Sequence, residues 1–371
     1  MLRFTLNGEP VEVADVSPNT TLLQWLRSER LTGTKEGCAE GDCGACTVVL
    51  LDDRAPGGPT YRAINSCLLL LPMVHGRTVW TVEGIGTPAA PHPVQQAMVD
   101  TMGSQCGYCT PGFVMSLFEA CYREDMEKAW QLDDQLCGNL CRCTGYRPIR
   151  EAGIQTGGTR PDDRFLAALR GPRSRPEHLE HGADGELFIA PVSLDEATAA
   201  LREHPTARLI CGATDLGLDV TKKHVRFPVL VSTEHIAELQ GIEDTGDAWS
   251  IGASTWLTDL EAWAADALPV LHRMLRYWAA TCVLYVVCIG LLQVQVAQGL
   301  SNAGAAHGLI AFGACGVLAF YLLIRANAWL KLTPDQLAVS QAVFSLSCAV
   351  WAYAISGPLR AAMLTMTIVI I

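Results

Sequence analysis

Residues 36–46 read Glu36-Gly-Cys-Ala-Glu-Gly-Asp-Cys-Gly-Ala-Cys46, and a further cysteine, Cys67, follows downstream. Cys38, Cys43 and Cys46 thus have the spacing C-x4-C-x2-C, which with a distant fourth thiol is typical of plant-type [2Fe-2S] centres. The glycines between the thiols let the backbone approach closely and point N–H groups at cluster sulfurs. The stretch therefore predicts an iron–sulfur loop.

A second set of four cysteines has a different spacing. Cys106 and Cys109 form C-x2-C, and Cys141 and Cys143 form C-x-C. Two spacings predict two cluster domains in series, an arrangement suited to passing single electrons. Structural zinc stays open as an alternative for this second set, because C-x2-C pairs also serve tetrahedral zinc sites.

The fifteen cysteines and the net charge of -11 also narrow the functional class. The first residues do not have the pattern of a secretory signal, so we expect reduced thiols rather than disulfides. The acidic balance argues against nucleic acid as a partner. Cys121, Cys137 and Cys211 have no assigned partner, and Cys137 is an alternative ligand for the second set.

Patterning predicts an α+β multidomain fold. Asn7-Gly8 lies between two short β-type runs, and residues 21–30 have helical periodicity, so residues 1–85 should form a small mixed sheet packed on a helix. From residue 93 to 145 the period becomes helical, and Thr110-Pro111 is typical of an N-cap followed by Pro at the first helical position. Residues 86–155 should therefore form a helical second domain.

A polar stretch, residues 156–184, reads as an exposed linker between domains. In the third domain, residues 185–275, a helix is expected at 193–202 and a strand at 207–210. The small-residue turn Cys211-Gly-Ala-Thr-Asp-Leu-Gly217 follows that strand. Such a turn can cradle a phosphate with backbone N–H groups, although a plain strand turn is the commoner explanation.

Residues 276–371 are apolar and predict about three to four transmembrane helices. No Asp, Glu, Lys or Arg lies between Tyr277 and Ile324, a run long enough for two spans, and a third run covers residues 336–359. The last run is too short to cross a bilayer before Ile371. The flanking Arg and Lys residues place residues 1–275 in the cytoplasm. The alternative is a soluble bundle with an unusually apolar core.

Residues 1–275 resemble the xanthine dehydrogenase small subunits of the molybdenum hydroxylase family. The likeness rests on residues 36–46, on Gln105-Cys-Gly-Tyr-Cys-Thr-Pro-Gly112 and on Gly138-Asn-Leu-Cys-Arg-Cys-Thr-Gly-Tyr-Arg-Pro148. It implies a cytoplasmic oxidoreductase subunit with two [2Fe-2S] clusters. The implied domains are a ferredoxin-like β-grasp domain, a four-helix [2Fe-2S] bundle and the start of an α/β FAD-binding domain.

The resemblance also implies an electron route. Electrons would leave molybdopterin on a separate large subunit, pass the Cys106 set and then the Cys38 set, and reach FAD and finally NAD. Gln105 matches the position that approaches the pterin, although a turn residue is an equal alternative. The residues that match the segment against the flavin diphosphate are Gly212, Ala213, Thr214, Asp215 and Leu216. No residue of this chain would perform the hydroxylation.

After residue 275 the resemblance stops, which predicts a truncated FAD domain lacking its other flavin contacts. The tail weakly resembles the membrane-spanning sensor regions that precede bacterial diguanylate cyclase domains. Two alternatives follow from this tail. One is a membrane-anchored iron–sulfur redox carrier or sensor, and the other is a non-functional fusion of two truncated genes.

Overall fold

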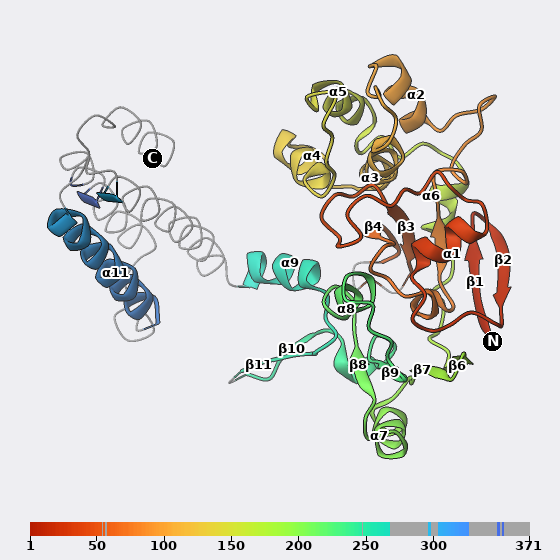
Figure 1. Ribbon diagram of the computed structural model, residues 1–371. Helices are drawn as coiled ribbons and strands as arrows, with labels where there is room; N and C mark the ends of the chain where they lie inside the picture. Colours follow the sequence, from red (N-terminus) through yellow and green to blue (C-terminus); the bar gives the residue numbers. More distant parts are fainter. Residues whose placement is uncertain are drawn as a thin grey trace. The chain divides into compact units, whose positions relative to one another are not determined.

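The computed structural model describes residues 1–53, 55, 58–246, 248–267, 296–297, 303–325, 347–348 and 351. The chain divides into two compact units, Met1–Thr255 and Trp256–Ile371 (Figure 1). Each unit is described by itself.

The first domain is a five-stranded mixed sheet in the order β2-β1-β5-β3-β4, packed on one helix. Asn7 and Gly8 have φ of 56° and 93°, the left-handed turn that their dipeptide favours between antiparallel strands. The elements are β1 (Leu2–Leu6), β2 (Glu9–Val13), α1 (Leu22–Ser28), β3 (Thr47–Asp52), β4 (Thr60–Asn65), the 3-10 turn η1 (Leu71–Val74) and β5 (Thr78–Trp80). The predicted mixed sheet and helix are confirmed.

The second domain contains the expected four helices. They are α2 (Pro93–Asp100), α3 (Thr110–Tyr122), α4 (Ala129–Leu136) and α5 (Arg147–Thr156). Phe113, Leu117 and Phe118 of α3 are fully buried at the centre of the bundle. Helix α3 begins one residue earlier than predicted: Cys109 is the N-cap, and Thr110 and Pro111 are already helical.

The stretch expected to be an exposed linker contains α6 (Arg164–Ala168) and β6 (Leu179–Ala183). Phe165 and Leu166 of α6 are buried in the same core as the four helices. The Tyr61 hydroxyl of the first domain donates to the Phe165 carbonyl at 3.0 Å. Polar composition suggested exposure, but two apolar residues are sufficient to fasten this segment to both cluster domains.

The third domain has a four-stranded sheet in the order β6-β7-β9-β8. Strand β9 pairs in parallel with both β7 and β8, which requires the helical crossovers α7 and α8 between them. The elements are β7 (Glu186–Ala190), α7 (Leu194–Glu203), β8 (Arg208–Ile210), α8 (Leu216–Thr221), β9 (Val229–Ser232), the 3-10 turn η2 (Ala237–Leu239), β10 (Ile242–Asp244) and β11 (Trp249–Ile251). Ser193 caps α7 as predicted.

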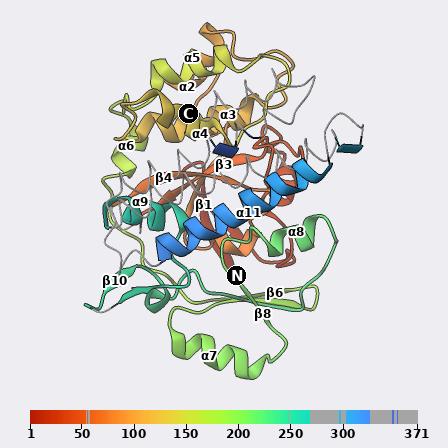
Figure 2. The same cartoon turned by 90° about the vertical axis from the view of Figure 1, so that its left-hand side faces the viewer.

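One hydrophobic core joins the first and third domains. Leu2, Leu26 and Leu70 of the first domain lie in the same buried cluster as Phe188 and Leu230 of the third. Both views place the five-stranded sheet between the four-helix bundle and the third domain (Figures 1 and 2). The part of the flavin domain in this unit therefore packs its apolar face on its neighbour.

The second unit contains α9 (Leu257–Ala267) and α11 (Ala303–Arg325). The Phe312 ring of α11 lies 5.5 Å from the Trp351 ring, centre to centre. Among the described residues, the structure has no helix of the length and apolar character that a membrane crossing needs. The second predicted span coincides with α11, whereas most of the first and third, and all of the last apolar run, lie outside the described residues. The predicted transmembrane part is thus not supported.

Candidate iron–sulfur and flavin sites

The first four cysteines come together from three parts of the sheet domain. Cys38 and Cys43 lie in the loop after α1, Cys46 directly precedes β3, and Cys67 closely follows β4. Cys38 donates its backbone N–H to the Cys43 sulfur at 3.3 Å. The thiols form two hydrogen-bonded pairs, Cys38 with Cys43 and Cys46 with Cys67.

Within each of these pairs one thiol ionises more readily than the other. Burial raises the pKa of Cys38, but hydrogen bonds from the backbone of Glu40 and from Cys43 outweigh it, so the pKa is lowered. Burial raises the pKa of Cys43. The hydrogen bond from Cys67 lowers the pKa of Cys46 to about 7, and the same bond raises the pKa of Cys67. Thiolate is the form that binds iron. Each pair therefore contains one cysteine whose lowered pKa favours the thiolate, next to a second cysteine whose pKa is raised.

The second four cysteines also form two pairs, Cys106 with Cys143 and Cys109 with Cys141. Burial raises the pKa of Cys109 to about 12. Burial also raises the pKa of Cys141, but Thr144 outweighs it and the pKa is lowered, because its hydroxyl lies 3.1 Å and its N–H 3.4 Å from the sulfur. Cys109 caps α3, where the helix dipole favours negative charge.

The grouping of the thiols bears on which metal centre they fit. Among the described residues, no group of three or more His, Cys, Asp or Glu side chains is placed to hold a single metal ion. Four two-thiol pairs match the four irons of two [2Fe-2S] clusters, in which four thiolates serve two irons. The chemistry of the donor set and the backbone N–H groups aimed at the sulfurs therefore fit such clusters.

The two cysteine loops touch each other. A Cβ on Gly112 would lie 2.0 Å from the Gly44 carbonyl oxygen, so glycine is required for this approach. The buried Asn139 side chain donates to the Gly44 carbonyl at 3.0 Å. Leu140 N–H donates to the Cys43 carbonyl, also at 3.0 Å. This backbone hydrogen bond directly links the residue before Cys141 to a cysteine of the first set.

The candidate flavin loop follows β8. Gly212 and Ala213 have φ of 65° and 59°, so the chain turns through two left-handed residues. Gly212, Thr214 and Asp215 are exposed, whereas Ala213 is buried and Leu216 is half-buried. Nothing lies within 4 Å of a Cβ built on Gly212, which leaves open space beside the loop. This turn could receive a diphosphate.

Two residues that sequence reasoning missed hold this loop. Glu234 accepts the Gly212 N–H at 2.8 Å and forms an ion pair of 2.6 Å with Arg77 of the first domain. Neither belongs to a recognisable motif. Their role depends on contacts between distant parts of the chain, so no local pattern could have indicated it.

Helix α8, which follows the flavin loop, touches the first cysteine loop. A Cβ on Gly217 would lie 2.8 Å from the Leu68 carbonyl oxygen, beside Cys67. The Lys222 ammonium donates to the Cys38 carbonyl at 2.5 Å and lies 3.0 Å from a Glu40 carboxylate oxygen. The structure thus brings the predicted flavin loop and the first cluster loop together.

Two cysteines of the second set, Cys106 and Cys143, are exposed, whereas Cys109 is half-buried and Cys141 is buried. Gln105 is exposed next to the exposed Cys106. Large apolar side chains are also exposed in this domain, namely Val99, Met102, Tyr108, Trp130, Leu140, Tyr146 and Ile154. Cys137 is exposed and outside both pairs, whereas Cys121 is buried 3.3 Å from the Thr159 hydroxyl.

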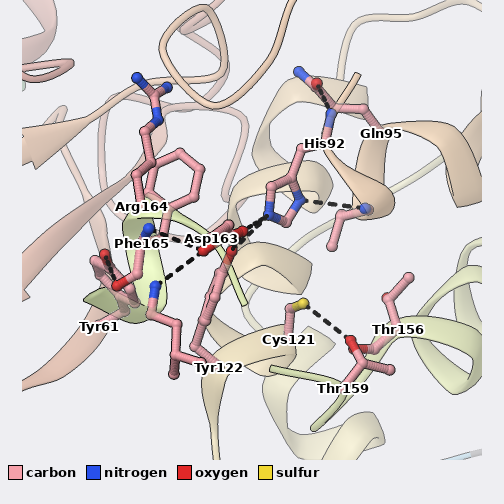
Figure 3. A network of polar contacts seen from close by, with 12 residues as sticks. Tyr61, His92, Gln95, Cys121, Tyr122, Thr156, Thr159, Asp163, Arg164 and Phe165 are labelled. Atoms are coloured by element: carbon pink, nitrogen blue, oxygen red, sulfur yellow. Dashed lines mark hydrogen bonds and ion pairs between the residues drawn. The ribbon is translucent and has the colours of Figure 1, made fainter. Parts of the chain in front are cut away.

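A buried polar network fastens the helical domain to α6 (Figure 3). His92 lies 2.9 Å from the Tyr122 hydroxyl, which donates to Asp163 at 2.5 Å. Asp163 also caps α6 by accepting the N–H groups of Phe165 and Leu166. Burial lowers the pKa of His92 to about 4, although Asp163 opposes the shift.

Comparison with known domains gives three matches in chain order. A 2Fe-2S iron-sulfur cluster binding domain matches residues 4–71, and a [2Fe-2S] binding domain matches residues 81–153. An FAD binding domain in molybdopterin dehydrogenase matches residues 181–291, and this match ends beyond the predicted boundary at 275. The chain is therefore an iron–sulfur protein with two [2Fe-2S] domains and an FAD-binding domain.

Sequence relatives narrow this class. The chain is 34% identical over 348 residues to a xanthine dehydrogenase of Drosophila subobscura, covering 78% of this chain and 26% of that protein. It is 36% identical over 326 residues to aldehyde oxidase 2 of Cavia porcellus, covering 73% and 24%. Quinoline 2-oxidoreductase from Pseudomonas putida 86 has a TM-score of 0.36 at 32% identity, covering 47% of this chain and 97% of that one.

The order of the three domains and the relatives support assignment to the molybdenum hydroxylase family. The chain spans about a quarter of the length of the curated relatives it matches. Those relatives are oxidoreductases, and the chain corresponds to their iron–sulfur and flavin part.

Proposed function

We propose that this chain is the iron–sulfur and flavin electron-transfer subunit of a xanthine dehydrogenase-type enzyme. The observation that carries the proposal is the arrangement of the four thiol pairs. They form two sets whose loops touch each other, and the helix after the flavin loop touches the loop of the first set. Because these contacts connect the second cysteine set to the first, and the first to the helix after the flavin loop, they form a continuous route for electrons.

The Cys106 set, two of whose thiols are exposed, is the entry of this route. We assign Gln105 to the contact with molybdopterin on a partner chain, because it is exposed beside Cys106. The exposed apolar side chains of the helical domain would be covered by that partner, since such residues mark interaction surfaces when they gather on one domain. The hydroxylation itself would take place on the partner, which would also select the substrate.

The link between the two sites consists of groups of this chain. Leu140 N–H, next to Cys141, meets the Cys43 carbonyl, and Asn139 keeps the loops together. The Cys38 set is the second carrier, and the loop of residues 212–216 holds the flavin. FAD bound there would supply the chemistry that joins electrons arriving singly to a two-electron acceptor, which the family resemblance implies to be NAD.

The membrane-anchored carrier or sensor is not preferred, because its anchoring helices have no support among the described residues. The relation of residues 276–371 to bacterial sensor regions stays a hypothesis. We propose cytoplasmic placement for residues 1–275, where thiols stay reduced for cluster assembly.

The first test is the iron, sulfide and flavin content of the full chain, purified without oxygen. Two [2Fe-2S] clusters and one flavin per chain are expected, with both clusters reduced on addition of dithionite. A chain that holds zinc, or one cluster only, would contradict the proposal.

The flavin loop is tested by Gly212→Ala, with Gly185→Ala as the matched control. Both glycines have positive φ, and both have open space around a built Cβ. Alanine therefore causes the same kind of backbone strain at either position. If the flavin diphosphate fills the space at Gly212, only Gly212→Ala loses flavin. Equal flavin content in both variants would place the flavin elsewhere.

A further inference from the structure

Lys222 reaches from the flavin domain into the first cysteine loop. It follows directly after α8, and its ammonium group contacts two groups of that loop, the Cys38 carbonyl and the Glu40 carboxylate. Cys38 lies 184 positions away in the sequence. A single cation therefore joins the flavin domain to a residue that supplies a cluster thiol.

The charges around this contact are mostly negative. The ammonium group interacts with Glu40, Cys38 and Asp42, which all belong to the cysteine loop. A [2Fe-2S] cluster with four thiolates is itself anionic, and reduction adds one more negative charge. A cation held beside it favours the reduced form, since opposite charges at short range attract.

The contact is specific to one of two neighbouring lysines. Lys223, the next residue, pairs with Asp219 of its own helix at 2.7 Å. Helix α8 is also held at Leu68 through Gly217, so the position of Lys222 relative to the loop does not depend on its own flexible side chain alone. The two lysines thus offer a matched pair with the same charge.

We propose that Lys222 is a positioning residue for the last cluster before the flavin: it holds the Cys38 loop against α8 and raises the reduction potential of the first cluster, leaving the second unchanged. The proposal rests on the proposed electron-transfer function for the presence of the first cluster. Its consequence is that the flavin domain sets the potential of the cluster that feeds it.

The test is a redox titration of the full chain, purified without oxygen, with each cluster followed by its own electron paramagnetic resonance signal. In Lys222→Gln the uncompensated Glu40 carboxylate remains, so the potential of the first cluster falls. Lys222→Arg keeps the charge and restores most of the potential. Lys223→Gln, the matched control, leaves both potentials unchanged.

Glu40→Gln gives the complementary result, a rise in the potential of the first cluster, and the double variant with Lys222→Gln lies between the two single variants. Unchanged potentials in Lys222→Gln with both clusters intact would overturn this inference alone. An equal fall for Lys223→Gln would overturn it too, because general surface charge would then explain the shift. Absence of the first cluster from the unmodified chain would overturn the proposed function and this inference together.

Discussion

The two cysteine sites differ in how far each is enclosed by the chain. In the first site Cys46 and Cys67 are both 2% exposed, whereas in the second site Cys106 and Cys143 are exposed at the surface. Strands β3 and β4 flank the first site, and Lys222 after α8 contacts its loop. The difference supports the proposed direction, in which the open site would receive electrons from another molecule and the enclosed site would pass them on within this one.

The largest expected effect separates the two sites completely. Cys43→Ser should remove the first cluster and leave the second, and Cys141→Ser should do the reverse, because each loses one of four thiolate ligands. Iron analysis and the two resonance signals measure this. Cys137→Ser is the control, since that exposed thiol belongs to neither of the two cysteine sets. Loss of a cluster in the control would show that the ligand assignment is wrong.

The next effect concerns the contact between the sites. Gly112→Ala places a Cβ 2.0 Å from the Gly44 carbonyl oxygen, so the two domains must move apart. We expect a loss of about 1–3 kcal/mol in the free energy of unfolding, together with weaker magnetic coupling between the clusters. Urea unfolding and resonance spectra measure the two effects. Gly138→Ala, with open space at its Cβ, should change neither.

Lowering the pH should reduce the stability of the helical domain, which holds the second cysteine site. The folded protein keeps His92 neutral to about pH 4, whereas in the unfolded chain it takes up a proton near pH 6.5. The unfolded state therefore binds more protons between these values, so the free energy of unfolding falls as the pH drops from 6.5 to 4, by at most about 3 kcal/mol.

The measurement is the urea midpoint at about pH 7 and about pH 5, on either side of the ordinary histidine pKa. His92→Gln should lower stability at the higher pH but reduce the difference between the two pH values. Tyr122, Asp163 and Arg164 surround this ring and are unchanged in the variant. His224→Gln, at an exposed position, is the control and should keep the full difference.

The smallest effect is kinetic. A water-soluble iron chelator should remove the second cluster several-fold faster than the first, because two of its thiols are exposed. The decay of the two resonance signals after chelator addition measures both rates in one sample. Loss of the first cluster before the second would contradict the proposed enclosure.

Cysteine spacing predicted two sets of thiols, because ligand chemistry is encoded locally in C-x4-C-x2-C and in the later pairs, and their role as cluster ligands stays a prediction. Spacing could not predict which two thiols of each set hydrogen-bond, since that depends on how Cys67 returns from β4. The sequence did not indicate the roles of Lys222 and Glu234, because Lys222 contacts the Cys38 loop and Glu234 pairs with Arg77, both far away in the first domain. Phe165 was missed for a different reason: two apolar residues in a polar stretch give too weak a periodicity to indicate burial.

The core shared by Leu2, Leu70, Phe188 and Leu230 has a consequence for biosynthesis. The first domain leaves the ribosome well before residue 230 is made, and at about 5–20 residues per second the delay is on the order of ten seconds. During that interval part of its apolar face has no partner, so the nascent chain exposes apolar surface that can associate with other proteins. Chaperones would then have a window in which to bind the growing chain.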